Sequence, residues 1–145
     1  MSTEQNKRNH LRFIEESWNK GNLAVIEELA APGVVAHFLP PGMPPGTEGL
    51  KRFIMGFRAA FPDVHIAVEE IVGEGNETLA RWTMTGTQQG QFQAIPPTGR
   101  KVSVTGIEIW SYDADGKRVE GWSTVDQMGM LQQLGVIPPL GQAGR

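Results

Sequence analysis

One carboxylate stands in an otherwise apolar strand pattern in the second half of the chain. Alternation along the predicted strand Lys101–Tyr112 places Glu108 on one face with Val102, Val104, Gly106, Trp110 and Tyr112. Burial disfavours the charged form of a carboxyl group and raises its pKa, so Glu108 suits a general acid or base near neutral pH. Gly106 would leave room for a ligand beside it. The alternative is a structural ion pair with a buried arginine such as Arg81, because ion pairs also perturb pKa values.

Two further polar residues lie on the last predicted strand or directly after it. An odd hairpin register places Ser123 beside Glu108, whereas a slip by one residue would reverse its face. Because no glycine of a nucleophile elbow flanks Ser123, we expect it to line a pocket rather than to attack a substrate. Asp126 precedes a short apolar helical segment that ends at Gly135. It can act as an acid/base group or cap that helix, and its position favours the cap.

The remaining candidates are spread over other strands. Alternation turns His37 away from its apolar neighbours, toward a pocket mouth or toward solvent. Arg81 could orient a substrate or simply be solvated. Tryptophans are typical of a core, but aromatic rings that border a polar group also suit a pocket for a planar organic molecule. This second interpretation applies to Trp82, Trp110 and Trp122.

Composition excludes several classes of function. The chain has 145 residues and no cysteine, and its three histidines lack metal-site spacing, so we expect no metal. With 13 basic and 16 acidic residues and a net charge of −3, it has no basic cluster for nucleic acid or an anionic membrane. No apolar run approaches the roughly 18 residues of a membrane span, which predicts a cytoplasmic protein.

The order of the predicted elements indicates an α+β fold. We expect a single domain over 1–145, with a helical half (1–62), a sheet half (63–126), and a short helix followed by a Gly/Pro tail (127–145). Ser2 with Gln5 predicts an N-cap, and Thr47 is expected to cap the most amphipathic helix. The predicted strands are Val64–Val72, Glu77–Thr87, Lys101–Tyr112 and Arg118–Val125, packed as a curved, mostly antiparallel sheet with helices on one face.

The predicted sheet carries apolar residues on both faces. Ile107 and Ile109 point away from the face that holds Glu108. Helices can cover only one face, so the second apolar stripe predicts a homodimer through the outer sheet face. The alternative is that the C-terminal tail covers this stripe.

A series of short motifs resembles one family over nearly the whole chain. The motifs are Val35-Ala36-His37, Ala60-Phe61-Pro62-Asp63, Ala80-Arg81-Trp82-Thr83, Gly86-Thr87-Gln88, Ile95-Pro96-Pro97-Thr98-Gly99, Asp115-Gly116-Lys117, Glu120-Gly121-Trp122 and Gln133-Leu134-Gly135. They resemble the SnoaL-like polyketide cyclases, also called ester cyclases, of the nuclear transport factor two-like superfamily. The resemblance implies a cone-shaped α+β barrel and cofactor-free acid/base chemistry that closes a ring in a polycyclic aromatic ester.

The resemblance also assigns roles to individual positions. The family's catalytic aspartate matches Ser123, a hydroxyl that cannot replace a carboxylate as proton shuttle, and a frequent family histidine matches Gln88. The family's pocket histidine matches Glu108, and His37 matches a residue at the pocket mouth. We therefore expect Glu108, with His37 or Asp126, to carry acid/base chemistry on a hydrophobic small molecule. The expected substrate contacts are Ser123, Gln88, Arg81, Trp82, Trp110 and Trp122.

Two alternatives to a cyclase remain open at this point. One is an enzyme of the epoxide hydrolase or dehydratase type, which would use the same carboxylate for a different proton transfer. The other is a non-catalytic module of the same fold that binds hydrophobic ligands.

Overall fold

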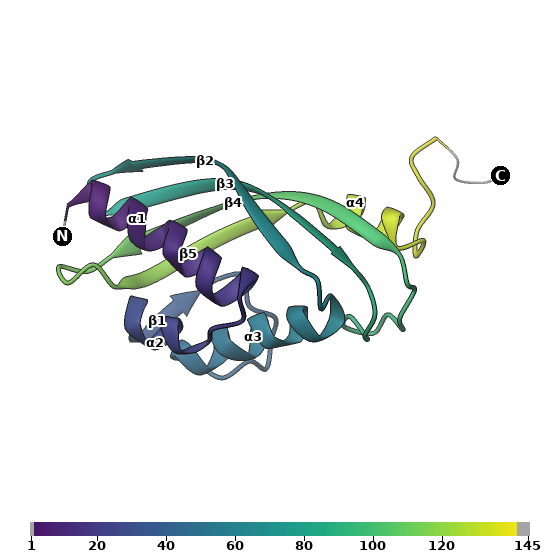
Figure 1. Ribbon diagram of the computed structural model, residues 1–145, viewed down its shortest axis with the longest axis horizontal. Helices are drawn as coiled ribbons and strands as arrows, with labels where there is room; N and C mark the ends of the chain where they lie inside the picture. Colours follow the sequence, from purple (N-terminus) through teal and green to yellow (C-terminus); the bar gives the residue numbers. More distant parts are fainter. Residues whose placement is uncertain (1, 142–145) are drawn as a thin grey trace.

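The structure, a computed structural model, describes residues 2–141; the end of the expected Gly/Pro tail, 142–145, lies outside the described residues. Helices lie along one face of a curved sheet (Figure 1). The elements in chain order are α1 (Thr3–Phe13), a π-helical segment (Ile14–Asn19) that continues it, α2 (Ala24–Leu29), β1 (Ala30–Ala36), α3 (Gly46–Ala60), β2 (His65–Glu74), β3 (Glu77–Thr87), β4 (Lys101–Tyr112), β5 (Arg118–Val125) and α4 (Gln127–Gln133).

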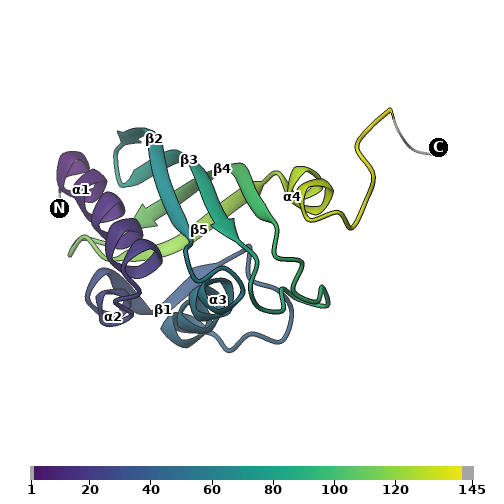
Figure 2. The same ribbon diagram turned by 45° about the vertical axis from the view of Figure 1, so that its right-hand side comes forward.

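The strands form a five-stranded sheet in the order β1-β5-β4-β3-β2. β1 runs parallel to β5, and every other neighbouring pair is antiparallel. The two edge strands, β1 and β2, do not pair within the described residues, so the expected barrel is an open cone (Figure 2). The predicted bounds of β3, β4 and β5 are confirmed to the residue, whereas β2 is shifted toward the hairpin turn that follows it.

Of the two caps expected in the helical half, the one at Ser2 is confirmed and the one at Thr47 is wrong. The Ser2 hydroxyl accepts a hydrogen bond from the backbone N–H of Gln5 at 3.1 Å. Thr47, by contrast, lies inside the first turn of α3, which begins at Gly46 with no side-chain cap. Gly46 has a φ of +71°, and a Cβ there would meet the Pro32 carbonyl oxygen at 2.2 Å. A close approach to β1 that only glycine allows therefore determines where α3 begins.

The core consists of two apolar clusters on the helix-covered face of the sheet, and Trp18 packs against both of them. One cluster, around Phe61 and Val104, joins the sheet to α4. The other, around Ile26 and Trp110, joins it to α1, α2 and α3. Among the described residues, no helix is both long and apolar enough to cross a membrane.

Candidate active site

A cavity of about 720 Å³ lies between the helices and the inner face of the sheet. Its wall is mainly apolar and rich in aromatic side chains, including Phe13, Trp18, Phe53, Phe57, Trp82 and Trp110. The polar side chains on the wall are Gln93, Glu108, Arg118, Ser123, Thr124, Asp126 and Gln127. Such a wall suits a small molecule with a planar apolar body and a few polar groups.

Glu108 lies between small neighbours, which leaves open space above its carboxylate. In the strand register it faces Ala80 on β3 and Ser123 on β5, so the odd hairpin register expected for Ser123 is confirmed. The expected free space over Gly106 is wrong, because a Cβ at Gly106 would lie 2.4 Å from ring atoms of Trp82. The indole of Trp82 fills that space, and the room for a ligand lies over Glu108 instead.

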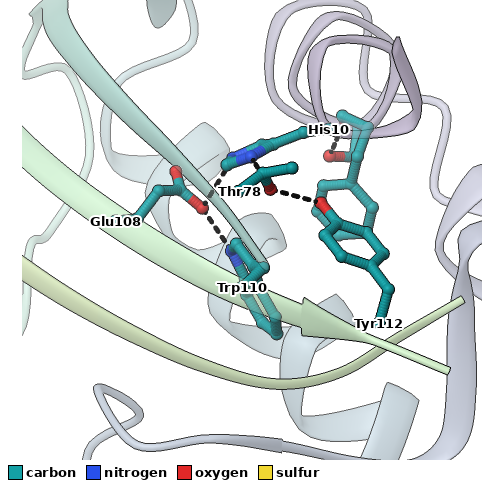
Figure 3. Close-up of polar contacts among 7 residues, drawn as sticks. His10, Thr78, Glu108, Trp110 and Tyr112 are labelled. Atoms are coloured by element: carbon teal, nitrogen blue, oxygen red, sulfur yellow. Dashed lines mark hydrogen bonds and ion pairs between the residues drawn. The ribbon is translucent and has the colours of Figure 1, made fainter. Parts of the chain in front are cut away.

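The two oxygens of the Glu108 carboxylate have different surroundings (Figure 3). Oε2 accepts a hydrogen bond from the indole N–H of Trp110 and lies 3.4 Å from Nε2 of His10 on α1. Oε1 has no hydrogen-bond partner among the described residues, and the side chain lines the cavity with 12% of its surface exposed. One oxygen is thus fixed by the protein, and the other is free to meet a ligand.

His10 continues the polar contacts away from the cavity. Its Nδ1 lies 2.8 Å from the Thr78 hydroxyl oxygen, which in turn lies 2.9 Å from the hydroxyl oxygen of Tyr112 (Figure 3). A neutral His10 fits one proton arrangement, in which Tyr112 donates to Thr78, Thr78 donates to Nδ1, and Nε2 carries its proton on the side of Glu108 without completing a hydrogen bond. This tautomer requires a neutral His10.

The pKa values of the pair agree with that arrangement. Complete burial lowers the pKa of His10 and outweighs the opposing effect of Glu108, so the imidazole is neutral at pH 7. Burial alone would raise the pKa of Glu108. The contacts with His10 and Trp110 and the charge of Arg118 outweigh burial and hold the Glu108 pKa below its ordinary value. The raised pKa expected for Glu108 from its apolar strand pattern is therefore wrong, and Glu108 is an ionised carboxylate in an apolar cavity.

A buried arginine does accompany Glu108, but it is Arg118 rather than the expected Arg81. Arg81 lies on the outer face, where its Nε is 3.4 Å from a carboxylate oxygen of Glu70, and it does not line the cavity. Arg118 is 1% exposed and packs its guanidinium 3.6 Å from the ring centroid of Phe13 and 4.5 Å from that of Trp110.

The other expected site residues divide between the cavity and its surroundings. Ser123, Trp82 and Trp110 line the cavity. Asp126 also lines it, and the expected cap is confirmed, because its carboxylate accepts the backbone N–H of Gly129 at 2.9 Å. Capping does not prevent the same carboxylate from meeting a ligand.

Besides Arg81, three expected residues, His37, Gln88 and Trp122, do not line the cavity. His37 bonds to Glu120 at 2.7 Å and stacks on Trp122 at a centroid distance of 5.1 Å, on the outer side of the sheet. Gln88 is fully buried beneath the loop 95–99, where its amide donates to backbone carbonyls and accepts from Thr98. Gln88 therefore stabilises a loop rather than contacting the ligand space.

Sequence reasoning missed His10, Thr78, Tyr112 and Arg118. A signal for His10 was present, since it shares the helical spacing of the buried face of α1 with Asn6 and Phe13. For Arg118 the strand pattern gave the wrong face. Ser111 pairs with Glu120 but Tyr112 pairs with Arg118, so an additional residue on β5 forms a bulge that reverses the alternation and turns Arg118 inward.

The open α+β cone is the nuclear transport factor two-like fold, and in this chain it encloses an apolar cavity with a carboxylate on its wall. The chain belongs to the SnoaL-like polyketide cyclase family, whose sequence model matches residues 8–134. The resemblance found in the sequence motifs is therefore confirmed. No protein of curated function matches the chain significantly.

Solved structures of similar proteins agree with this assignment. TsrD from Streptomyces laurentii is 26% identical, with a TM-score of 0.86 over 94% of this chain and 99% of that one. IdmH, a candidate polyketide cyclase from Streptomyces antibioticus, is 33% identical, with a TM-score of 0.78 over 90% and 99% of the two chains. AclR from Streptomyces galilaeus, a candidate hydroxylase, is 28% identical, with a TM-score of 0.82 over 97% and 87%.

Proposed function

We propose that the protein is a cofactor-independent enzyme of the polyketide cyclase type that carries out acid/base chemistry on a hydrophobic aromatic or polycyclic molecule. The observation that carries this proposal is the carboxylate of Glu108, held at Oε2 by Trp110 and His10 and free at Oε1 inside the apolar cavity. A fixed carboxylate with an unengaged oxygen is the arrangement that a general base requires.

Glu108 replaces the aspartate that related cyclases carry at the position of Ser123. Both residues lie directly opposite each other on β4 and β5, so a carboxylate at either position reaches the same part of the cavity. In the proposed reaction, Oε1 of Glu108 takes a proton from the bound substrate and returns it to the product. The Ser123 hydroxyl, which has no hydrogen-bond partner among the described residues, offers a hydrogen bond to a substrate oxygen.

His10 is proposed as a positioning residue, because it touches Glu108 and not the cavity wall. Its imidazole restricts the carboxylate rotation and stabilises the ionised form. Asp126 lines the cavity near the end of β5 and is the second carboxylate that a substrate can meet there.

The test is a screen followed by a matched pair of variants. Aromatic esters, ketones and epoxides are screened by thermal shift, and products are analysed for each compound that binds. We expect Glu108→Gln to abolish turnover while the melting temperature stays near that of the wild type. Glu70→Gln, which removes a carboxylate from the outer face, should leave turnover unchanged. Full turnover in Glu108→Gln would contradict the proposal, and ligand binding by a wild type that forms no product would indicate a binding module.

We also propose that the protein is a homodimer that pairs through the outer sheet face. An unbroken apolar row crosses four strands in register, from Val72 through Leu79 and Ile109 to Trp122. Val72 is 47% exposed and Trp122 is 41% exposed. A second copy of this chain presents the same row and can cover it.

A further inference from the structure

Arg118 is a buried cation whose donors are unused. The residue is 1% exposed, yet none of its three guanidinium nitrogens has a hydrogen-bond partner among the described residues. Burial lowers its pKa, but a guanidinium remains charged at every pH the folded protein experiences. A buried charge without hydrogen bonds is unfavourable, so the protein retains Arg118 at a cost to stability.

The guanidinium is held in a fixed plane. Phe13 and Trp110, both on the cavity wall, cover it at 3.6 and 4.5 Å from the ring centroids to its central carbon. With aromatic rings against the flat surface of the guanidinium, its N–H groups are directed along the edge. That edge is the part of the side chain that recognises planar anions through two parallel hydrogen bonds.

The acidic group near Arg118 does not satisfy it. Glu108 favours the charged form of Arg118, but the two side chains form no ion pair within 4.0 Å. Oε2 of Glu108 is already engaged by His10 and Trp110. The hydroxyl of Tyr112 favours the charge more than Glu108 does, because its oxygen lies beside the guanidinium, but the geometry is too poor for a full hydrogen bond and the hydroxyl also contacts Thr78. Neither group offers the guanidinium two coplanar acceptor oxygens, which its edge binds through two parallel hydrogen bonds.

We propose that Arg118 is the anion-recognition residue of the cavity and that the ligand is a hydrophobic aromatic acid carrying one carboxylate. This inference rests on the proposed function and names its substrate class. The aromatic walls take the apolar body, and the carboxylate lies toward the Arg118 edge. A single negative charge is repelled less by the ionised carboxylate of Glu108 than a multiply charged group would be. A phosphate, with its additional charge, would be repelled by the nearby carboxylate of Glu108.

The experiment compares two ligands of the same shape, of which one has a charged pair of acceptor oxygens and the other a neutral amide. Anthracene-2-carboxylate and the neutral anthracene-2-carboxamide are titrated into the full-length protein by isothermal titration calorimetry. Because hydrogen bonds to charged groups are stronger than neutral ones, the wild type should bind the acid about tenfold more tightly than the amide. Equal affinities, or failure of the acid to bind, would overturn the proposal.

Two variants assign the preference to Arg118. Arg118→Met keeps an unbranched chain between Phe13 and Trp110 and should abolish the preference for the acid. Arg118→Lys keeps the charge without the planar edge and should retain only part of it. A purely structural Arg118 would instead lower the melting temperature of Arg118→Met and leave the ratio of the two affinities unchanged, which would also overturn the proposal. If Arg118→Met does not fold, Arg118→Lys and the wild-type comparison still decide the question.

The same titration distinguishes this inference from the proposed function. Glu108→Gln removes the proposed base but leaves Arg118 in place, so it should still prefer the acid over the amide. If the proposed catalytic function is wrong, the wild type should still prefer the acid over the amide. If the proposed anion site is wrong, turnover should still depend on Glu108.

Discussion

Nε2 of His10 and Oε2 of Glu108 lie 3.4 Å apart, although one residue belongs to the first helix and the other to the fourth strand. The contact joins α1 to the inner face of the sheet at the wall of the cavity. Its chemistry depends on two unequal effects, since burial keeps His10 neutral while its neighbours keep Glu108 ionised. The proposed base is therefore supported by a neutral imidazole rather than by a salt bridge at neutral pH.

The first prediction concerns stability against pH. The folded pKa of His10 lies below its ordinary 6.5, so the unfolded chain binds a proton first as the pH falls. The contribution of His10 to the free energy of unfolding is thus fully present above pH 6.5. Below that pH it decreases by at most about 1.4 kcal/mol per pH unit, until the pKa of His10 in the folded protein is reached. Glu108, whose pKa is also lowered, adds a decrease of the same sign below pH 4.5.

Urea unfolding at pH 7 and pH 5.5 measures this dependence. His10→Gln should be less stable than the wild type at pH 7 but lose less stability on acidification. His65→Gln, at an exposed position on β2, is the matched control and should keep the dependence of the wild type. An unchanged dependence in His10→Gln would contradict the assignment.

The second prediction concerns the hydroxyl between His10 and Tyr112. Thr78→Val preserves the shape of the side chain but removes the partner of both groups, which remain buried. We expect a loss of about 1–3 kcal/mol in the free energy of unfolding. Thr83→Val, on the opposite face of β3, should be nearly neutral. A similar stability for both variants in urea would show that the contacts of Thr78 do not stabilise the fold.

The third prediction concerns the close approach of Trp82 to Gly106. Gly106→Ala places a methyl group within 2.4 Å of the indole ring, so the ring must shift toward the cavity. Overpacking of this kind costs about 1–3 kcal/mol. Gly33→Ala, where no atom lies within 4 Å, is the control and should leave the melting temperature close to that of the wild type. Thermal unfolding distinguishes the two, and an unaffected Gly106→Ala would contradict the packing described.

The fourth prediction places a second carboxylate opposite Glu108. Ser123→Asp brings a like charge next to Glu108 across the strand pair and should raise the pKa of the proposed base. The acidic limb of the pH–rate profile should then move to higher pH. Ser123→Asn, which has the same shape without the charge, should leave the limb where it is in the wild type. Identical pH–rate profiles for the two variants would show that a charge at position 123 does not affect the reacting groups.

The fifth prediction concerns the proposed homodimer. Ile107 is 46% exposed on the outer sheet face, beside the apolar row, so Ile107→Lys places a charge in the interface without disturbing the core. Size-exclusion chromatography with light scattering should detect a dimer for the wild type and a monomer for Ile107→Lys. Met55→Lys, at a 52% exposed position on α3, should remain a dimer. A monomeric wild type would contradict the proposal.

The sequence determined a large part of the architecture. Period-two patterns and turn residues defined β3, β4 and β5, because local alternation decides which residues of a strand share a face. The same alternation selected Glu108, and the hairpin register brought Ser123 opposite it. The caps at Ser2 and Asp126 depend on residues three positions apart, and both were correctly predicted.

Tertiary structure decided which groups surround that carboxylate. His10 reaches Glu108 because α1 packs across the sheet, a contact between distant segments that no local pattern contains. Arg118 turns inward because a bulge in β5 reverses its alternation, and Trp82 occupies the space over Gly106 because the two residues are direct partners across β3 and β4. The sequence alone therefore identified the carboxylate, whereas helix packing and strand irregularity determined its charge state and its partners.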